Sequence, residues 1–222
     1  MSTLFEYGIL LPNGCRITHG SGSKIKHPFV DVDVKLHELS PGPTRDMYSP
    51  SFSGQAGFIE FTTSTRLPRH VHISGLGSPS IGRSPMPRLM SERIFVMDGV
   101  ALVELNGEIY VVPPKSLVTI TPGVPHTWTA CPAGVNISTA LDLPSTVECV
   151  SDGTFIMLYE YEEPTGFFPT AQTESLLTAD MYVRCDDLER IRIPKLTSQE
   201  VLEGCWFVWD RNLARSTVVP RF

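Results

Sequence analysis

Two histidines one residue apart, His70 and His72, are the first residues of this sequence that could do chemistry. They lie in RLPRHVHISG, a stretch that reads as an extended strand. On a strand, residues i and i+2 share a face and lie about 6.5–7 Å apart, so both imidazole rings can lean toward one point. Imidazole nitrogens bind metal ions, which makes the pair a candidate part of a metal site. The pattern also fits two surface histidines, and the pair alone leaves both interpretations open.

Two further polar residues lie in similar contexts downstream. Glu92 opens the strand-like segment 92–99, and His126 follows a turn that contains proline and glycine, ITPGVPH. Three of the six histidines therefore lie in strand and turn contexts that also supply a carboxylate.

Many short strands would have to position these residues. The 19 prolines and 17 glycines separate short apolar runs, as is typical of an all-β sandwich or barrel. Asn106-Gly107 between two alternating runs is the clearest hairpin signal. Strands are expected at residues 29–39, 55–63, 68–74, 93–99, 101–112, 116–123, 126–130, 135–143 and 154–163. Short helices are expected at 174–182 and 197–204, the second with a Thr197/Glu200 capping box.

The residues with this spacing resemble the two motifs of the cupin superfamily. The first motif joins His-x-His to a glutamate and then, after six intervening residues, to a glycine, which His70, His72, Glu92 and Gly99 match. The second places a histidine after a proline-containing turn, as His126 does here. The resemblance covers roughly residues 55–145 and implies that His70, His72, Glu92 and His126 bind a metal ion.

The sequence also departs from the cupin motifs. Nineteen residues separate His72 from Glu92, where the motif has three or four, so an insertion is expected between two strands. Serine or alanine stands at three motif positions that carry glycine or asparagine in cupins, namely Ser64, Ser116 and Ala130.

The resemblance implies an all-β fold, the cupin double-stranded β-helix or jelly-roll barrel. We expect a single domain over residues 1–222, with the barrel at about 50–165. Residues 1–49 would add an N-terminal strand extension, and residues 166–222 a C-terminal extension with short helices.

The implied ligand set predicts a divalent metal cofactor. Four protein ligands would close a tetrahedral zinc site, whereas a six-coordinate ion would keep two positions open for substrate. Fe(II) is therefore favoured, with Mn, Ni or Zn as alternatives. Glu92 and His126 are the predicted catalytic residues.

Apolar residues near the implied ligands are candidates for a substrate cavity, and each could equally be plain barrel core. Trp128 is the strongest candidate, because it lies two residues from His126 on the same strand face. Arginines in the segment 66–93 reverse the local charge and could hold an anionic substrate or form a solvated basic loop. The predicted substrate-binding residues are Trp128, Phe58, Phe61, Ile94, Met157, Tyr159, Arg83 and Arg88.

Composition narrows the class of protein. The net charge of −6 argues against a nucleic-acid-binding protein, and no apolar run reaches the length of a membrane helix. The sequence shows no secretory signal, and its five cysteines have no paired spacing, so we expect a cytoplasmic protein with reduced thiols. A small-molecule substrate and a homodimer are expected, without nucleic-acid or membrane partners.

Three functions remain open. The main prediction is a cupin metalloenzyme, an oxygenase or other oxidoreductase resembling quercetin dioxygenase and cupins of natural-product pathways. It would act on a small hydrophobic substrate such as an aromatic or polyketide-derived metabolite. The alternative is a non-redox isomerase, dehydratase, cyclase or decarboxylase on the same substrate class. A non-catalytic ligand-binding cupin is the third.

Overall fold

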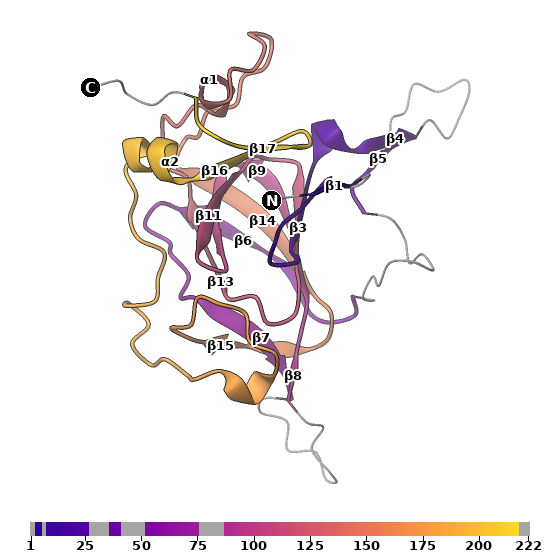
Figure 1. The fold of residues 1–222 in the computed structure, drawn as a ribbon, viewed down its shortest axis with the longest axis vertical. Helices are drawn as coiled ribbons and strands as arrows, with labels where there is room; N and C mark the ends of the chain where they lie inside the picture. The colour runs from indigo at the N-terminus through magenta and orange to yellow at the C-terminus, as the bar shows by residue number, and fades with distance from the viewer. Residues whose placement is uncertain (1–2, 6–7, 27–35, 41–51, 76–86, 218–222) are drawn as a thin grey trace.

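The computed structural model describes residues 3–5, 8–26, 36–40, 52–75 and 87–217. Its strands form two facing antiparallel sheets, joined by short turns, with one parallel pair in the second sheet (Figure 1). The seven-stranded sheet runs in the order β1 (Thr3–Phe5), β2 (Gly8–Leu10), β3 (Arg16–His19), β12 (Ser116–Ile120), β9 (Glu92–Gly99), β14 (Thr154–Tyr161) and β6 (Ala56–Thr62).

The second sheet has eight strands. Its order is β15 (Thr165–Pro169), β7 (His70–Ser74), β13 (His126–Ala130), β10 (Ala101–Leu105), β11 (Glu108–Val112), β16 (Trp206–Trp209) and β17 (Asn212–Arg215), with β8 (Arg88–Leu89) paired to β7. This arrangement is the jelly-roll barrel predicted from the sequence. Strands from both predicted extensions join the two sheets, β1 to β3 at one end of the chain and β15 to β17 at the other.

The barrel core lies between the sheets. Alternation along β10 shows how it forms, because Ala101, Val103 and Leu105 point inward and are fully buried. Leu102 points outward, yet it is also buried, because the C-terminal segment covers this sheet with Val201 of α2 (Ser198–Gly204) and Phe207. The long apolar run of β10 therefore serves two cores.

Of three local predictions, the hairpin and the capping box are confirmed and one helix is shorter than expected. The Asn106-Gly107 hairpin is confirmed, since both residues have positive φ, 55° and 82°, and connect β10 to β11. The capping box of α2 is confirmed, with Thr197 and Glu200 exchanging both hydrogen bonds. The helix predicted at 174–182 is limited to one 3-10 turn, η2 (Ala179–Met181).

The strand predicted at 135–143 is wrong. Residues Ile137–Ala140 form the short helix α1, because the Asn136 side chain accepts the Thr139 backbone N–H and caps a helical turn. The strand predicted at 29–39 lies mostly outside the described residues. Its final part is β5 (Leu36–Glu38), which pairs with β4 (Lys24–Lys26) in a separate two-stranded sheet. A 3-10 turn, η1 (Gly20–Gly22), precedes β4.

The described helices are short. None of them is long and apolar enough to cross a membrane.

Candidate metal centre

Three strands bring the four predicted ligands to one place inside the barrel. β7 supplies His70 and His72, β13 begins at His126, and β9 begins at Glu92. His126 pairs with His70 in the register of β13 and β7, which places residues 56 positions apart in the chain side by side. All four side chains are buried.

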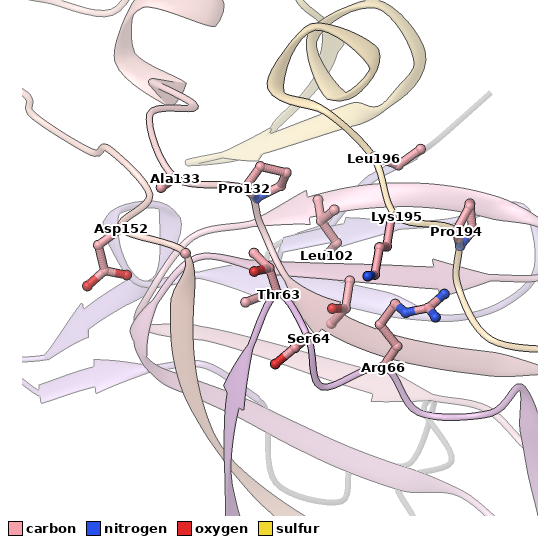
Figure 2. Close-up of a pocket in the computed structure, with 13 residues that line it drawn as sticks. Thr63, Ser64, Arg66, Leu102, Pro132, Ala133, Asp152, Pro194, Lys195 and Leu196 are labelled. Carbon is pink, nitrogen blue, oxygen red and sulfur yellow. The ribbon is translucent and has the colours of Figure 1, made fainter. Parts of the chain in front are cut away.

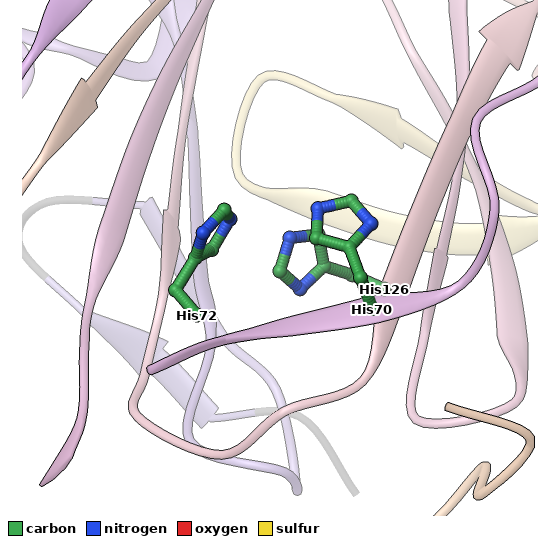
Figure 3. Close-up of side chains that lie close together, drawn as sticks. All are labelled: His70, His72 and His126. Carbon is green, nitrogen blue, oxygen red and sulfur yellow. The ribbon is translucent and has the colours of Figure 1, made fainter. Parts of the chain in front are cut away.

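The three imidazole rings converge (Figure 3). One nitrogen from each of His70, His72 and His126 lies within 4.8 Å of the others, so the three could hold a metal ion together. Glu92 lies next to two of them, because its Oε2 atom is 3.3 Å from His72 Nε2 and 3.0 Å from His126 Nε2. The three histidines therefore form one cluster, and Glu92 borders it at His72 and His126.

Backbone carbonyls orient two of the rings. His70 Nδ1 lies 2.7 Å from the Pro68 carbonyl oxygen, and His126 Nδ1 lies 2.8 Å from that of Val124. A carbonyl only accepts, so each Nδ1 must carry the proton and donate it. In the neutral ring the Nε2 lone pair is then free, which is the state that binds a metal ion.

Several buried polar atoms in the cluster lack a hydrogen bond. Among the described residues, both ring nitrogens of His72, Nε2 of His126 and Oε2 of Glu92 have no hydrogen-bond partner. Buried polar groups are rarely left unpaired, and a divalent cation between the rings would bind one nitrogen of each histidine and the Glu92 oxygen. The residues present therefore fit a metal ion.

The protonation states agree with this fit. Burial lowers the pKa of His70 and of His72, and neighbouring imidazoles lower it further, so both rings are neutral at pH 7. Burial alone would raise the pKa of Glu92, but His72 and His126 outweigh this effect and lower it, so the carboxylate is ionised. His70 and His72 thus offer neutral nitrogen donors, and Glu92 offers an anionic oxygen donor.

Two aromatic residues that were not predicted from the sequence, Tyr161 and Phe167, border the cluster. The Tyr161 ring lies 4.6 Å from that of His72, and the Phe167 ring lies 4.5 Å from that of His70 and 5.1 Å from that of His72. Tyr161 could have been found from strand alternation, since it is two residues beyond the candidate Tyr159. The position of Phe167 depends on the pairing of β15 with β7, for which no local signal exists.

The predicted apolar lining divides between the inside and the outside of the barrel. Four of the predicted lining residues lie in the buried barrel core, namely Trp128, Phe61, Ile94 and Met157. Tyr159 is half-buried and packs against that core. Phe58 instead lies on the outer face of β6, 69% exposed, and we no longer place it in the cavity. Phe58 and Phe61 are three residues apart, so a strand must send them to opposite faces.

Trp128 keeps a feature that suits ligand binding. Its indole Nε1 is buried and has no hydrogen-bond partner in the part of the chain that the structure describes. A buried donor of this kind can be satisfied by a bound water or by an acceptor group of a ligand.

The arginines predicted to hold an anionic substrate have other partners where the structure describes them. Arg88 is half-exposed and pairs with Glu163 at 2.5 Å, with Glu162 at 3.9 Å. Arg83 lies outside the described residues.

A separate cavity of about 440 Å³ lies beyond the other end of β13 (Figure 2). Arg66, Lys195 and Asp152 contribute charged groups to its wall. It contains none of the four clustered residues, and Arg66 is already paired with Glu189 at 2.7 Å. The convergence of buried donors, and not cavity size, therefore identifies the candidate site.

No model of a known protein family matches this chain, and no curated protein matches it. Solved structures with a similar fold include a dTDP sugar isomerase from Desulfovibrio desulfuricans G20, with 12% identity, 82% of this chain and 90% of that chain covered, and a TM-score of 0.40. A dTDP-6-deoxy-D-glucose-3,5-epimerase from Legionella pneumophila, in complex with dTDP-4-keto-L-rhamnose, has 12% identity, coverage of 77% and 78%, and a TM-score of 0.43. A dTDP-4-dehydrorhamnose 3,5-epimerase from Bacillus anthracis, with TDP and PPi bound, has 12% identity, coverage of 96% and 99%, and a TM-score of 0.42.

These similarities correct the main functional prediction. The proteins named are an isomerase and two epimerases, which catalyse non-redox reactions, so the prediction of an oxygenase or other oxidoreductase is wrong. The specific resemblance to quercetin dioxygenase falls with it, and so does the reason for favouring iron. The substrates in those names belong to those proteins, and what this chain is similar to is their fold.

Proposed function

We propose that this protein is a metal-dependent, non-redox enzyme of the isomerase or lyase type that transfers protons on a small organic substrate. One observation carries the proposal: three buried imidazoles converge on one centre, an ionised carboxylate lies beside two of them, and backbone carbonyls orient two of the rings so that Nε2 faces the cluster. Unpaired buried polar groups destabilise a fold, so barrel stability does not explain this arrangement, whereas metal binding would.

His70, His72, His126 and Glu92 would hold a divalent ion. When bound, the ion would act as a Lewis acid on a substrate oxygen and so acidify a neighbouring C–H or O–H group. Three nitrogen donors and one oxygen donor suit zinc, manganese, nickel and iron(II) alike. No redox change is required, so metal analysis of the purified protein decides the identity of the ion.

The chain's own residues divide the handling of protons. Glu92 is ionised and can accept a proton at its carboxylate. Burial raises the pKa of Tyr161, and Glu92 and Tyr159 raise it further, so the phenol keeps its proton and can donate a hydrogen bond. A carboxylate that accepts and a phenol that donates, both beside His72, are suited to moving a proton on a bound substrate.

Metal uptake is the first part of the test. Chelator-treated protein is titrated with Zn²⁺ and Mn²⁺ by calorimetry, and we expect one ion per chain for the wild type. His70→Ala and His126→Ala should each weaken binding at least 100-fold. His37→Ala is the matched control, because His37 is an exposed histidine on β5 and should leave binding unchanged.

Proton transfer is the second part. Phenylpyruvate and pyruvate are incubated in D₂O under argon with the metal-loaded protein, and deuterium entry at C3 is followed by NMR. We expect acceleration by the wild type, a loss of at least 100-fold in Glu92→Gln, and no loss in His37→Ala. A wild type that binds neither metal ion, or exchange that Glu92→Gln leaves unchanged, contradicts the proposal.

A further inference from the structure

Phe167 lies beside the metal centre and is itself exposed to solvent. It lies on β15, the outer strand of the eight-stranded sheet as described, and pairs in register with His72 of β7. Register partners point to the same side, and the Phe167 ring accordingly contacts the rings of both His70 and His72. Nevertheless 51% of Phe167 is exposed, whereas the two histidines are buried.

Ordinary core packing does not account for this exposure. Phe61 and Phe155, which do form the barrel core, are fully buried and stack on each other with centroids 4.5 Å apart. Phe167 contacts buried imidazoles, and about half of its surface stays exposed to solvent. One face of the ring is therefore available to a group that enters from solvent.

Two tyrosines of β14 continue the row of aromatic rings that begins at Phe167, one buried and one half-buried. Tyr161 lies 6.4 Å from Phe167 in an edge-to-face arrangement, with an interplanar angle of 88°. Tyr159 follows at 5.1 Å from Tyr161. We call Tyr159, Tyr161 and Phe167 the aromatic wall. It leads from the surface at Phe167 to the buried ring of Tyr161 beside His72.

We propose that the aromatic wall binds a flat apolar ring of the substrate, with Phe167 as the residue that determines this preference. The inference rests on the proposed function, because the substrate's oxygen-bearing end would then reach the metal centre. Aromatic rings prefer offset or edge-to-face contacts at centroid distances of about 4.5–7 Å, the range that the wall already shows internally. The chemical class is an aromatic acid or enol with an oxygen chelating group.

The charge at the centre suits the same class. Three neutral imidazoles, one carboxylate and a divalent ion would leave a net charge of about +1 in a site shielded from water. An anionic oxygen group complements that charge, and the wall complements the ring attached to it.

Mandelate and lactate test the inference, because they share a 2-hydroxycarboxylate group and differ in a phenyl or a methyl group. Each acid is titrated calorimetrically into Mn²⁺-loaded protein, because a six-coordinate ion held by four protein ligands keeps positions open for the acid. For the wild type we expect mandelate to bind at least 10-fold more tightly than lactate. In Phe167→Ala this ratio should fall below about 3 while lactate binding stays within 3-fold, and Phe167→Trp should restore the ratio. Phe58→Ala, which removes an exposed phenylalanine on the outer face of β6, should keep it.

The outcomes separate the two proposals. Failure of Mn²⁺ to bind the wild type overturns the metal centre itself. If Mn²⁺ binds but mandelate has no advantage, or neither acid binds, the aromatic preference is overturned and the metal centre stands. An advantage for mandelate that survives in Phe167→Ala also overturns the role of Phe167.

Discussion

Nε2 of His126 lies 3.0 Å from Oε2 of Glu92, while Nδ1 of the same ring donates to the Val124 carbonyl 2.8 Å away. The second contact fixes a proton on Nδ1 and leaves Nε2 as the nitrogen that faces Glu92. Glu92 is nevertheless a buried carboxylate with no arginine or lysine among its ion-pair partners in the described residues. Such a buried charge weakens the metal-free fold, and a cation between the two residues would relieve this.

Replacing Glu92 should therefore separate stability from metal binding. In Glu92→Gln, a neutral amide replaces the buried charge, and we expect the free energy of unfolding in EDTA to rise by about 1–2 kcal/mol. Affinity for Zn²⁺ should fall at least 10-fold, because the amide lacks the negative charge. Urea denaturation with EDTA and with Zn²⁺ measures both effects.

Glu104 supplies the control for that experiment. It is also a buried glutamate, but Arg69 pairs with it at 2.6 Å. Glu104→Gln should lower the free energy of unfolding by about 1–3 kcal/mol, since it leaves the arginine without its ionic partner. Equal destabilisation of the metal-free protein by both substitutions would show that Glu92 is not held in an unfavourable contact.

Gly99 is the last residue of β9, at the end opposite to Glu92, and it tests how closely β9 and β14 approach each other. Its φ is +69°, and a Cβ there would lie 2.2 Å from the Thr154 carbonyl oxygen. Gly99→Ala should lower the free energy of unfolding by at least about 3 kcal/mol, because both the backbone conformation and the contact disfavour a side chain. Gly134 has φ +85° and nothing within 4 Å of its Cβ position, so Gly134→Ala should cost only about 1 kcal/mol. Chemical denaturation compares the two, and similar losses would rule out the close approach.

His19 joins the N-terminal strand β3 to the C-terminal hairpin of β16 and β17. Its Nδ1 accepts the backbone N–H of Asp210 at 3.0 Å and lies 2.7 Å from Ser21 Oγ. Its ring packs on that of Trp209 at 4.5 Å. An Nδ1 that accepts a hydrogen bond from a backbone amide must be unprotonated, so protonation of His19 at low pH should break its hydrogen bond with Asp210.

The pH dependence of stability follows from that contact. Burial lowers the pKa of His19 to about 4, with Lys115 adding to the shift and Asp210 and the Pro114 backbone opposing it. In the unfolded chain the pKa is about 6.5, so between pH 6.5 and 4 only the unfolded state takes up the proton and stability falls. We expect His19 to account for a loss of about 2 kcal/mol over this interval.

His19→Asn isolates this contribution, because an asparagine oxygen can accept the same amide and does not titrate near neutral pH. The stability difference between wild type and variant, measured by urea denaturation from pH 7.5 to 4.5, should change by about 2 kcal/mol. Parallel curves for the two proteins would show that His19 does not titrate differently on folding.

Much of the barrel could be predicted because its signals are local. Alternation with a period of two identifies the strand of His70 and His72 and the hairpin at Asn106, and a capping box identifies α2. The segment 135–143 failed because its β-branched residues favour a strand, while one side chain, that of Asn136, caps a helix.

The site could be predicted only in part. The histidine pair follows from strand geometry, and Glu92 and His126 were added through their resemblance to cupin motifs. Phe167 could not be predicted, because its contact with His72 arises from the pairing of β15 with β7, strands almost one hundred positions apart in the chain at their register partners. Phe58 was wrongly assigned to the cavity together with Phe61. The two residues are three positions apart on β6 and therefore lie on opposite faces of the strand.

Metal stoichiometry is the most direct test of the metal centre. Chelator-treated protein is dialysed against Co²⁺, and its visible absorption and metal content are measured for the wild type, for His70→Ala/His72→Ala/His126→Ala and for His37→Ala. The account predicts one Co²⁺ per chain and ligand-field absorption for the wild type and His37→Ala, and neither for the triple variant. A wild type that takes up no Co²⁺, or a triple variant that still binds it, would contradict the account.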